Sequence, residues 1–557
     1  MPRHDGDPER PAPRERFVIL SGAVMPYRKK TRLSKSVCAI FALLLFLFFR
    51  GIGDHGLLDP VEGVNASVAL NMAARGDFAA SILEGASHLG KSLGYWWLSA
   101  LSLLVFGWSE FAVRFWAAFG GLGMAAASWF IARRTMDGRA AGYAAVLAGT
   151  NLLTFAASQL AAPYTFYAFC VAAGLAGIVY AFQDRRFFFL FHAFSSLGLI
   201  VCGPAAFLLP WLAFLIYAYL CEQEHFLARA LLYWPGLAAT FLIAGGYLLS
   251  LYLENPAFLA SMRGLPRGVF GFLPWGLLFL IAGFFPWIGI LPCAVASAWP
   301  RDWSRVLPSQ KQDVLLMVWA AVFLVFGLLS GDAFLLTASV PPLASLCAGR
   351  LRAAEEEEYR LPRSALYLSG ASMLAGLAWL GGSRGELLRI AAMSVLPWAC
   401  LSVLLLVVWY RASPLKLGRR LCAMAMFSLL PLAGAFDLLA ESLSMREAGI
   451  FLRKELERED VVLQYAMNRP SLFFYTGKDS FLTHLSAASP ANGEARSEED
   501  KRLINIWTGP RRVFMLVDRR RELSTSLRRE VFSYYENHNM LVLGNRRPGQ
   551  NRSEEGR

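Results

Sequence analysis

Charged residues are scarce in this chain: Asp, Glu, Lys and Arg make up 17% of its 557 residues, whereas 56% are hydrophobic. Soluble proteins carry about a quarter charged residues, so this scarcity excludes a chain that is soluble throughout. The apolar residues come in repeated runs of about 17–25 residues, which suits bilayer-spanning helices. The sequence therefore predicts an all-α polytopic membrane protein.

Cysteine clusters and glycine-rich loops are also lacking. The eight cysteines lie in or at the ends of apolar runs, with no CxxC motif and no Cys/His cluster. This pattern excludes a disulfide framework and a thiolate metal site. The polar connectors contain no Gly-rich nucleotide-binding loop. The spans carry almost no interior charge and show no related halves, which disfavours a transporter.

The basic residues lie in the connectors between apolar runs, although the formal net charge is +13. This placement argues against a nucleic-acid groove and follows the excess of Lys and Arg in cytoplasmic loops. It predicts a disordered cytoplasmic tail over 1–35, a membrane domain over 36–438 and a first outer loop over 53–109. About 13 spans are expected, near 37–52, 111–132, 140–156, 163–182, 187–202, 204–221, 231–253, 272–298, 314–329, 332–348, 364–382, 388–410 and 419–437.

Two segments depart from this pattern of spans. Residues 93–106 are apolar but too short to cross a bilayer comfortably, and they begin with three aromatic residues. They predict a helix lying along the outer membrane surface. Residues 439–557 are charged and alternate β-like runs (461–465, 512–518 and 540–545) with helical stretches. By the count of spans, this small α/β domain lies outside the cytoplasm.

The first outer loop concentrates titratable side chains in an otherwise apolar chain. These are Asp54, His55, Asp59, Glu62, His88 and Lys91, and they flank an amphipathic helix expected over 64–74. A carboxylate beside a bilayer can deprotonate an acceptor, and a lysine there can hold a lipid phosphate. We interpret the loop as the floor of an active site; the alternative is a solvated loop whose charges only mark the interface.

Five stretches, in this order, resemble the superfamily of protein O-mannosyltransferases and lipid A aminoarabinose transferases. They are DPVEGVNASVALNMAARGDF (59–78), Lys91 followed by YWWLSALSLLVFGWSEFAVRF (95–115), FLPWGLLFLIAGFFPWIGILP (272–292), SGDAFLLTASVPPLASLCAG (330–349) and VVLQYAMNRPSLFFYTGK (461–478). The resemblance implies the GT-C fold, a polyprenyl-phosphate sugar donor and an outer-face lipid, glycan or protein acceptor. It also implies the inner membrane of a bacterium as the location.

The chain departs from the family pattern at polar positions. Val61 stands where the family has the first Asp of an acidic pair, which leaves Glu62, and His88 stands for an aromatic residue before the lysine. The second outer loop (158–167) lacks the family's Asp, and Gly331 and Asp332 replace a Ser-Lys pair. The resemblance thus implies that the chain keeps the family's fold but has fewer of its polar site residues.

The resemblance, together with the position of Arg263 and Arg267 in an outer loop expected over 254–270, suggests a set of site residues. Asp59 or Glu62 is expected to be the catalytic base, whereas Lys91, His88, Arg263 and Arg267 are expected to hold the donor phosphate. A divalent metal held by His55 and Glu62, with His88 and Asp59, is an alternative; no other cofactor is expected. Two functions stay open: an active transferase, or a protein that binds or transports a polyprenyl phosphate or another lipid without transferring sugar.

Overall fold

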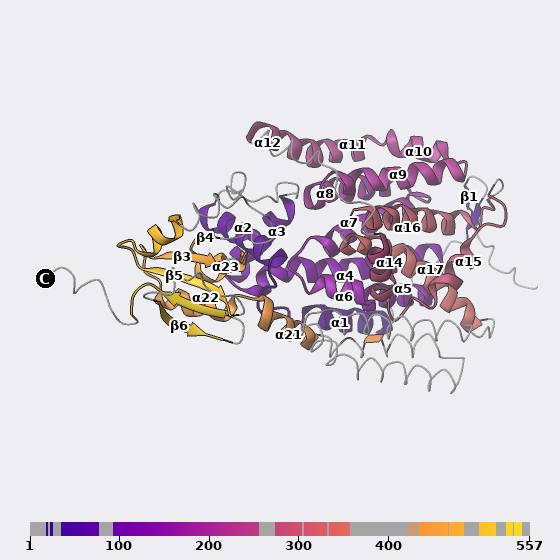
Figure 1. Cartoon of the computed structure of the whole chain (residues 1–557). Helices are drawn as coiled ribbons and strands as arrows, with labels where there is room; N and C mark the ends of the chain where they lie inside the picture. Colours follow the sequence, from indigo (N-terminus) through magenta and orange to yellow (C-terminus); the bar gives the residue numbers. More distant parts are fainter. Residues whose placement is uncertain are drawn as a thin grey trace, which may run out of the picture.

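Apolar helices lying side by side make up most of the chain, and a five-stranded sheet lies at one end of them (Figure 1). The structure is a computed structural model. It describes residues 18–20, 23–25, 35–76, 93–254, 273–303, 306–330, 333–356, 423, 425–426, 429, 433–465, 467–483, 501–519, 531–537 and 540–547. The last three predicted spans fall mostly outside these residues.

The helices of the N-terminal half begin with α1 (Lys35–Phe49), which precedes the first outer loop. They continue with α2 (Val61–Arg75), α3 (Gly94–Phe106), α4 (Glu110–Thr135), α5 (Gly138–Thr150), α6 (Leu152–Ser158), α7 (Tyr164–Ala181), η1 (Arg185–Phe187), α8 (Phe188–Cys202) and α9 (Pro204–Leu220). Serine and asparagine side chains start two of them. Ser109 caps α4 by accepting from the Ala112 amide, and Asn151 caps α6 by accepting from the Thr154 amide.

The helices then run to the base of the C-terminal domain. They are α10 (Glu224–Leu231), α11 (Trp234–Thr240), η2 (Phe241–Gly245), α12 (Gly246–Glu254), α14 (Leu273–Gly283), α15 (Leu291–Ala298), α16 (Lys311–Leu329), η3 (Ala333–Ser339), α17 (Val340–Glu356) and α21 (Ala433–Leu443). Small residues let some of them approach closely. A Cβ on Gly120 of α4 would lie 2.4 Å from the Phe166 nitrogen of α7.

The polytopic prediction is confirmed in its coarser form. Among the described residues, six helices are long and apolar enough to cross a membrane, or up to seven if the bent pair α5–α6 forms one span. Three shorter apolar helices are α1, α3 and α9. The expected number of about 13 spans stays a prediction.

The C-terminal domain is a mixed sheet with helices on both faces. Its elements are α22 (Arg446–Glu455), β3 (Val461–Tyr465), α23 (Ser471–Thr476), β4 (Ser480–Thr483), β5 (Val513–Asp518), β6 (Phe532–Glu536) and β7 (Met540–Gly544), with residues 501–507 also helical. The strand order is β4-β3-β5-β7-β6. Strand β3 pairs parallel with β4 and β5, whereas β7 pairs antiparallel with β5 and β6.

Three of these strands match the runs expected from the sequence, and two were not expected. Strand β4 has four residues, and β6 alternates polar and aromatic residues with little burial. Both lie at the edges of the sheet, where one side of a strand stays unpaired and the apolar signal is weak. In the segment expected to be a disordered tail, the described residues are Lys35 and the short antiparallel pair β1 (Val18–Leu20) and β2 (Ala23–Met25).

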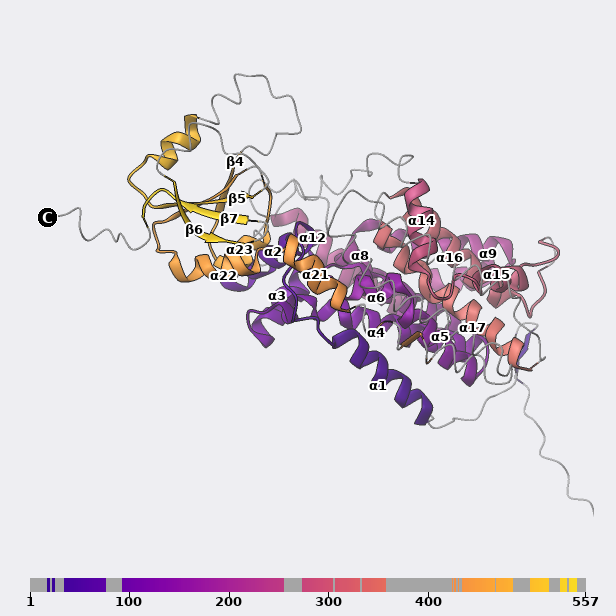
Figure 2. The same ribbon diagram turned by 60° about the horizontal axis from the view of Figure 1, so that its bottom comes forward.

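One end of the helical region contacts the C-terminal domain, and basic residues lie towards the other end. The C-terminal domain lies beside α2 and α3, whereas β1 lies at the far end (Figures 1 and 2). Helix α4 leads away from α3 for 26 residues, roughly 39 Å, and ends in Arg133 and Arg134. Near that end Arg352 Nε donates to Asp137 Oδ2 over 2.9 Å, which joins α17 to the α4–α5 turn. These basic residues are therefore separated from the C-terminal domain by the length of a span.

We expect reporters fused after residue 360 and after residue 557 to lie on opposite sides of the membrane. The physical reason is the excess of Lys and Arg that membrane proteins keep on the cytoplasmic side. A phosphatase that is active only outside and a fluorescent protein that folds only inside measure the two positions. Matching signals at both positions would refute the predicted topology.

Candidate active site at the first outer loop

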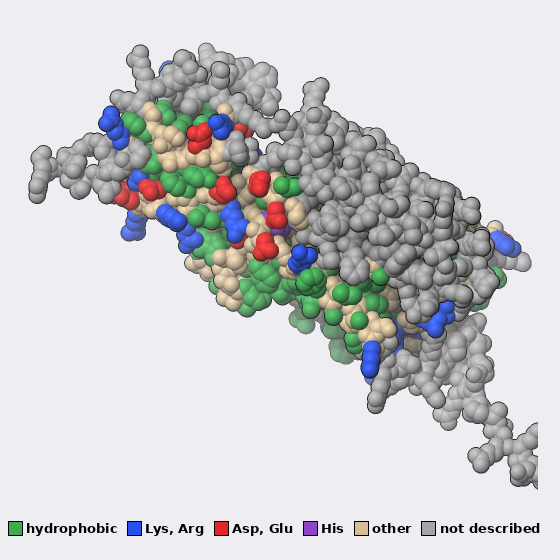
Figure 3. Space-filling model, turned by 90° about the horizontal axis from the view of Figure 1, so that it is seen from below, with side chains coloured by type: hydrophobic (Ala, Val, Ile, Leu, Met, Phe, Trp, Pro, Cys, Tyr) green, Lys and Arg blue, Asp and Glu red, His purple; other side chains and the backbone are tan. Residues whose placement is uncertain are grey.

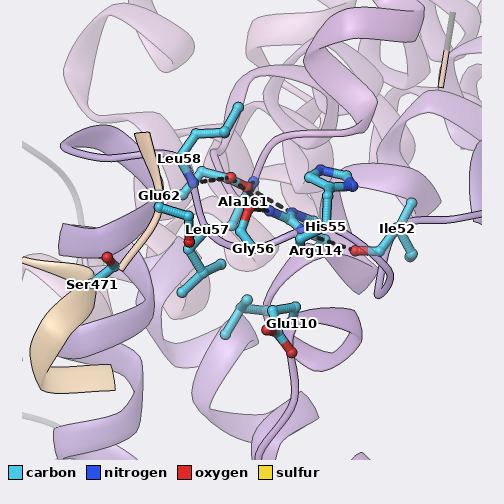
Figure 4. Close-up of polar contacts among 12 residues, drawn as sticks. Ile52, His55, Gly56, Leu57, Leu58, Glu62, Glu110, Arg114, Ala161 and Ser471 are labelled. Atoms are coloured by element: carbon cyan, nitrogen blue, oxygen red, sulfur yellow. Dashed lines mark hydrogen bonds and ion pairs between the residues drawn. The ribbon is translucent and has the colours of Figure 1, made fainter. Parts of the chain in front are cut away.

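A fully buried arginine organises the first outer loop. Arg114, in the second turn of α4, uses all five of its N–H donors (Figure 4). Nη1 donates to the carbonyl oxygens of Ile52 and His55, each over 2.8 Å, and Nη2 donates to that of Gly56 over 2.9 Å. Nε and Nη2 donate to the Glu62 carboxylate over 2.8 and 2.7 Å. The loop after α1 is thereby wrapped around one guanidinium.

The carboxylate oxygens of Glu62 also have hydrogen-bond partners at every acceptor position. Besides the two Arg114 bonds, Oε1 accepts from the Ala161 amide over 2.5 Å and Oε2 accepts from the Leu58 amide over 2.8 Å. Its carboxylate is fully buried, as is the guanidinium. Burial alone would raise the pKa of Glu62, but the Arg114 charge and these four hydrogen bonds hold that pKa below its ordinary value. Glu62 is therefore an ionised anchor with no free acceptor position.

Helix α2 also holds the second outer loop through its next turn. Asn65 Nδ2 donates to the Ala161 carbonyl over 2.7 Å, and Glu62, three residues earlier, holds the amide of the same residue. Trp96 of α3 donates from Nε1 to Asn65 Oδ1 over 2.9 Å. Residues three apart share a helix face. One face of α2 therefore binds both the backbone amide and the backbone carbonyl of Ala161.

Asp59 faces the C-terminal domain. Its Oδ1 accepts from the Ser471 amide over 2.9 Å and its Oδ2 accepts from the Ser471 hydroxyl, at the start of α23. The side chain is buried, and this burial raises the pKa of Asp59 to about 7, although the Ser471 bonds and the charge of Arg469 oppose the rise. Asp59 is thus a carboxyl group that titrates near neutral pH within a contact between two parts of the chain.

Further bonds join the first outer loop to the same domain. The Leu57 amide donates to the Tyr475 hydroxyl over 2.8 Å, and Ser67 Oγ donates to the Pro470 carbonyl over 2.8 Å. Arg446 of α22 forms an ion pair with Glu110 over 3.1 Å. Because Glu110 begins α4, the C-terminal domain contacts the loop, α2 and the start of a span together.

His55 is buried beside this network. Its Nδ1 lies 3.3 Å from the Gly51 carbonyl, and Nε2 has no hydrogen-bond partner among the residues described. Burial, with help from the Arg114 charge, lowers the pKa of His55 to about 4, so the ring is neutral at physiological pH. Within the described part of the chain, no group of three or more His, Cys, Asp or Glu side chains is arranged to hold a metal ion. The suggested metal pair of His55 and Glu62 therefore gains no geometric support.

The structure brings Asp59, Glu62 and His55 together but does not describe the other candidates. His88 and Lys91, and Arg263 and Arg267, lie outside the described residues. Exposed carboxylates gather nearby, where Figure 3 shows acidic side chains next to a histidine. Among the described residues, Asp54, Asp437 and Glu441 are exposed, and Asp437 of α21 interacts electrostatically with the other two.

Sequence reasoning missed Arg114, Ser471 and Tyr475 as site residues. Arg114 was visible as the last residue of the family-like GWSEFAVR stretch. A charged residue near the start of an otherwise apolar span signals a buried partner, so its pairing could have been anticipated. Ser471 and Tyr475 carry no such signal, because hydroxyl residues are common in surface helices and only docking gives them a role.

Comparisons with known proteins place this architecture. No family model matches the chain. The crystal structure of ArnT from Cupriavidus metallidurans bound to undecaprenyl phosphate covers 92% of this chain and 98% of its own, with a TM-score of 0.75 and 17% identity. The chain therefore has the fold of that protein, a GT-C fold, as the sequence predicted.

Curated relatives extend the likeness to sequence. An undecaprenyl phosphate-alpha-4-amino-4-deoxy-L-arabinose arabinosyl transferase of Sodalis glossinidius is 28% identical over 350 residues, 56% of this chain and 59% of that protein. A transferase of the same name from Aeromonas salmonicida is 24% identical over 63% of this chain and 66% of its own. An uncharacterised Aquifex aeolicus protein is 27% identical over 40% of this chain and 44% of its own. The chain thus spans about half to two thirds of these relatives, and the predicted resemblance to the aminoarabinose transferases is confirmed.

Arg114→Met should destabilise the protein by about 3–5 kcal/mol, because it leaves the buried Glu62 carboxylate without its partner. The double variant Arg114→Met, Glu62→Leu should lose less than Arg114→Met alone, since no unpaired charge remains. Thermal unfolding of purified protein in detergent measures both, with the exposed Arg139→Met as control, expected within about 0.5 kcal/mol of the parent. Equal stability of Arg114→Met and the parent would contradict the anchoring role.

Asp59→Asn should flatten the dependence of stability on pH between about 4 and 7, the interval between the ordinary pKa of an aspartate and the raised pKa of Asp59. A carboxyl whose pKa is raised in the folded state contributes stability below its ordinary pKa, and this contribution is lost as pH rises through about 7. Asparagine keeps an oxygen for the Ser471 amide and cannot ionise. The parent protein should therefore lose stability over this range relative to Asp59→Asn, with the exposed Asp54→Asn as the matched control. Parallel profiles for the parent and Asp59→Asn would disprove the raised pKa.

Proposed function

We propose that this protein is an integral-membrane glycosyltransferase. It would take a sugar from a polyprenyl-phosphate donor and transfer it to a lipid, glycan or protein acceptor at the outer face of a bacterial inner membrane. The observation that carries the proposal is the likeness of nearly the whole fold to ArnT bound to undecaprenyl phosphate. The named relatives support the same class of donor.

The donor phosphate would be held by basic side chains of the first outer loop and of the outer loop expected over 254–270. Lys91 and His88 follow α2 in the first outer loop, and Arg263 and Arg267 lie in the loop expected over 254–270. Charge-assisted bonds from Lys and Arg suit a phosphate that loses its sugar, because they stabilise the charge that develops on the leaving group.

The two carboxylates predicted to be catalytic have different roles: Glu62 positions the loops, and Asp59 accepts a proton. The four hydrogen bonds that Glu62 accepts support a positioning role, in which it fixes the first and second outer loops relative to each other. Asp59 is the better proton acceptor, since a base works best with a pKa near the working pH, and burial brings its pKa to about 7. Proton transfer at Asp59 would require its carboxylate to exchange the Ser471 hydroxyl for the acceptor.

A second candidate is a protein that binds a polyprenyl phosphate without transferring the sugar. The occupied carboxylates of Glu62 and Asp59 favour it, because neither reaches solvent in this conformation. It shares the donor-phosphate cations with the transferase but needs no base.

The two candidates are separated by one pair of measurements on purified protein. Binding of undecaprenyl phosphate is measured by thermal shift. Release of undecaprenyl phosphate from the corresponding aminoarabinose donor is measured with an envelope-lipid extract as acceptor. Binding with release supports the transferase, binding without release supports the lipid-binding protein, and failure to bind removes both.

Among variants, Asp59→Asn should lower turnover about 10²- to 10⁴-fold if Asp59 is the base. Lys91→Ala should mainly raise the donor concentration needed, since one charge-assisted contact is worth about 1.5–3 kcal/mol. Asp59→Asn is a fair test because it is expected to stay folded at neutral pH. Full turnover in both Asp59→Asn and Glu62→Gln would remove the first-loop base.

A further inference from the structure

The end of α3 lies at the level where α4 enters the membrane. Helix α3 ends at Phe106 and α4 begins at Glu110, so only three residues join them. Helix α4 is long and apolar enough to cross the bilayer. Trp108, two residues before it, therefore lies at the outer interface, a level that tryptophan favours in membrane proteins.

The last turns of α3 expose an apolar surface. Leu101, Leu104 and Val105 are 50%, 60% and 67% exposed, and their spacing places them on one side of the helix. In Figure 2 the end of α3 projects sideways from the helical region, below α22 and α23. An apolar helix surface at this level suits the boundary between headgroups and acyl chains.

A cation of the C-terminal domain lies directly over the tryptophan. The Arg453 guanidinium of α22 is 4.3 Å from the centre of the Trp108 ring, and the ring of Phe474 packs edge-on at 6.0 Å. Arg453 is exposed, so its donors remain available beyond the ring. Because Trp108 lies at the interface, Arg453 lies at the level of the phosphates.

Two exposed cations follow each other on this surface. Lys454 is the next residue of α22 and is also exposed. Two nearby carboxylates have cations of their own: Glu455 pairs with Arg512 over 3.3 Å, and Glu110 pairs with Arg446 over 3.1 Å. Among the described residues neither Arg453 nor Lys454 forms an ion pair with a carboxylate. Figure 3 shows basic side chains of the C-terminal domain beside an apolar surface.

We propose that Trp108, Arg453 and Lys454 form a binding surface for anionic phospholipid headgroups of the outer leaflet. The apolar side of α3 would enter the leaflet, the indole would lie at the interface, and the two cations would bind the lipid phosphate. The surface holds the C-terminal domain down on the bilayer, over the loop that it contacts through Ser471. This inference does not depend on the proposed transfer activity.

The test compares how lipids stabilise the full-length protein in detergent. The thermal midpoint is measured with added phosphatidylglycerol, with phosphatidylcholine, and with soluble glycerol phosphate. Phosphatidylglycerol should raise the midpoint of the parent most, and Arg453→Gln, Lys454→Gln should lose at least half of the difference from phosphatidylcholine. Arg453→Lys should keep it, because the charge is retained. A rise with glycerol phosphate equal to that with phosphatidylglycerol would show a soluble phosphate site instead.

The matched control is Lys501→Gln, Arg502→Gln, which removes the same charge from the opposite face of the sheet. Residues 501–507 pack through Leu503 and Trp507 on that face, whereas α22 packs through Leu452 on the other. The control should keep the full response to phosphatidylglycerol. Equal responses of the two double variants, whether kept or lost, would overturn the proposal. If Arg453→Gln, Lys454→Gln does not fold, Lys454→Gln alone should lower the response, and an unchanged response would refute the surface.

Discussion

A guanidinium removed from water must find an acceptor for each of its donors. At Arg114 that requirement shapes the end of the helical region next to the C-terminal domain. Five acceptors meet it, three of them backbone carbonyls of the loop after α1 and two the oxygens of Glu62. A buried charge pair is a weak source of net stability, because desolvation offsets most of the attraction. Its effect here is geometric, since the path of the loop brings acceptors to all five donors.

Helix α2 carries this constraint to two other parts of the chain. One face, through Glu62 and Asn65, holds the backbone of Ala161 in the second outer loop. Another contact, through Ser67, reaches the Pro470 carbonyl, next to the Ser471 that binds Asp59. The C-terminal domain and the second outer loop are therefore joined through α2. The raised pKa of Asp59 makes this contact sensitive to pH near neutrality.

The family-like motifs take on different roles once their contacts are known. Glu62 is held by Arg114, whereas its neighbour Val61 is 39% exposed. The buried carboxylates near the loop, Glu62 and Asp59, form hydrogen bonds that join separate parts of the chain.

Much of the fold could be predicted from the sequence, because its signals are local. Long apolar runs indicated the spans, the short run over 93–106 indicated α3, and alternating residues indicated β3, β5 and β7. The edge strands β4 and β6 were missed, since a strand with one unpaired, partly exposed side carries little apolar signal.

For the candidate site too, some features follow from the sequence and others only from the structure. The sequence by itself determined a membrane protein of the GT-C kind and the loop in which titratable residues gather. Hydropathy and motif order depend only on consecutive residues, so they can be read without the fold. Only the tertiary structure decided that Glu62 is an anchor, that Asp59 faces Ser471, and that Arg453 lies over Trp108. These roles depend on partners between 52 and 412 residues away. Whether a carboxylate is a base or an anchor is set by the donors that burial brings to it.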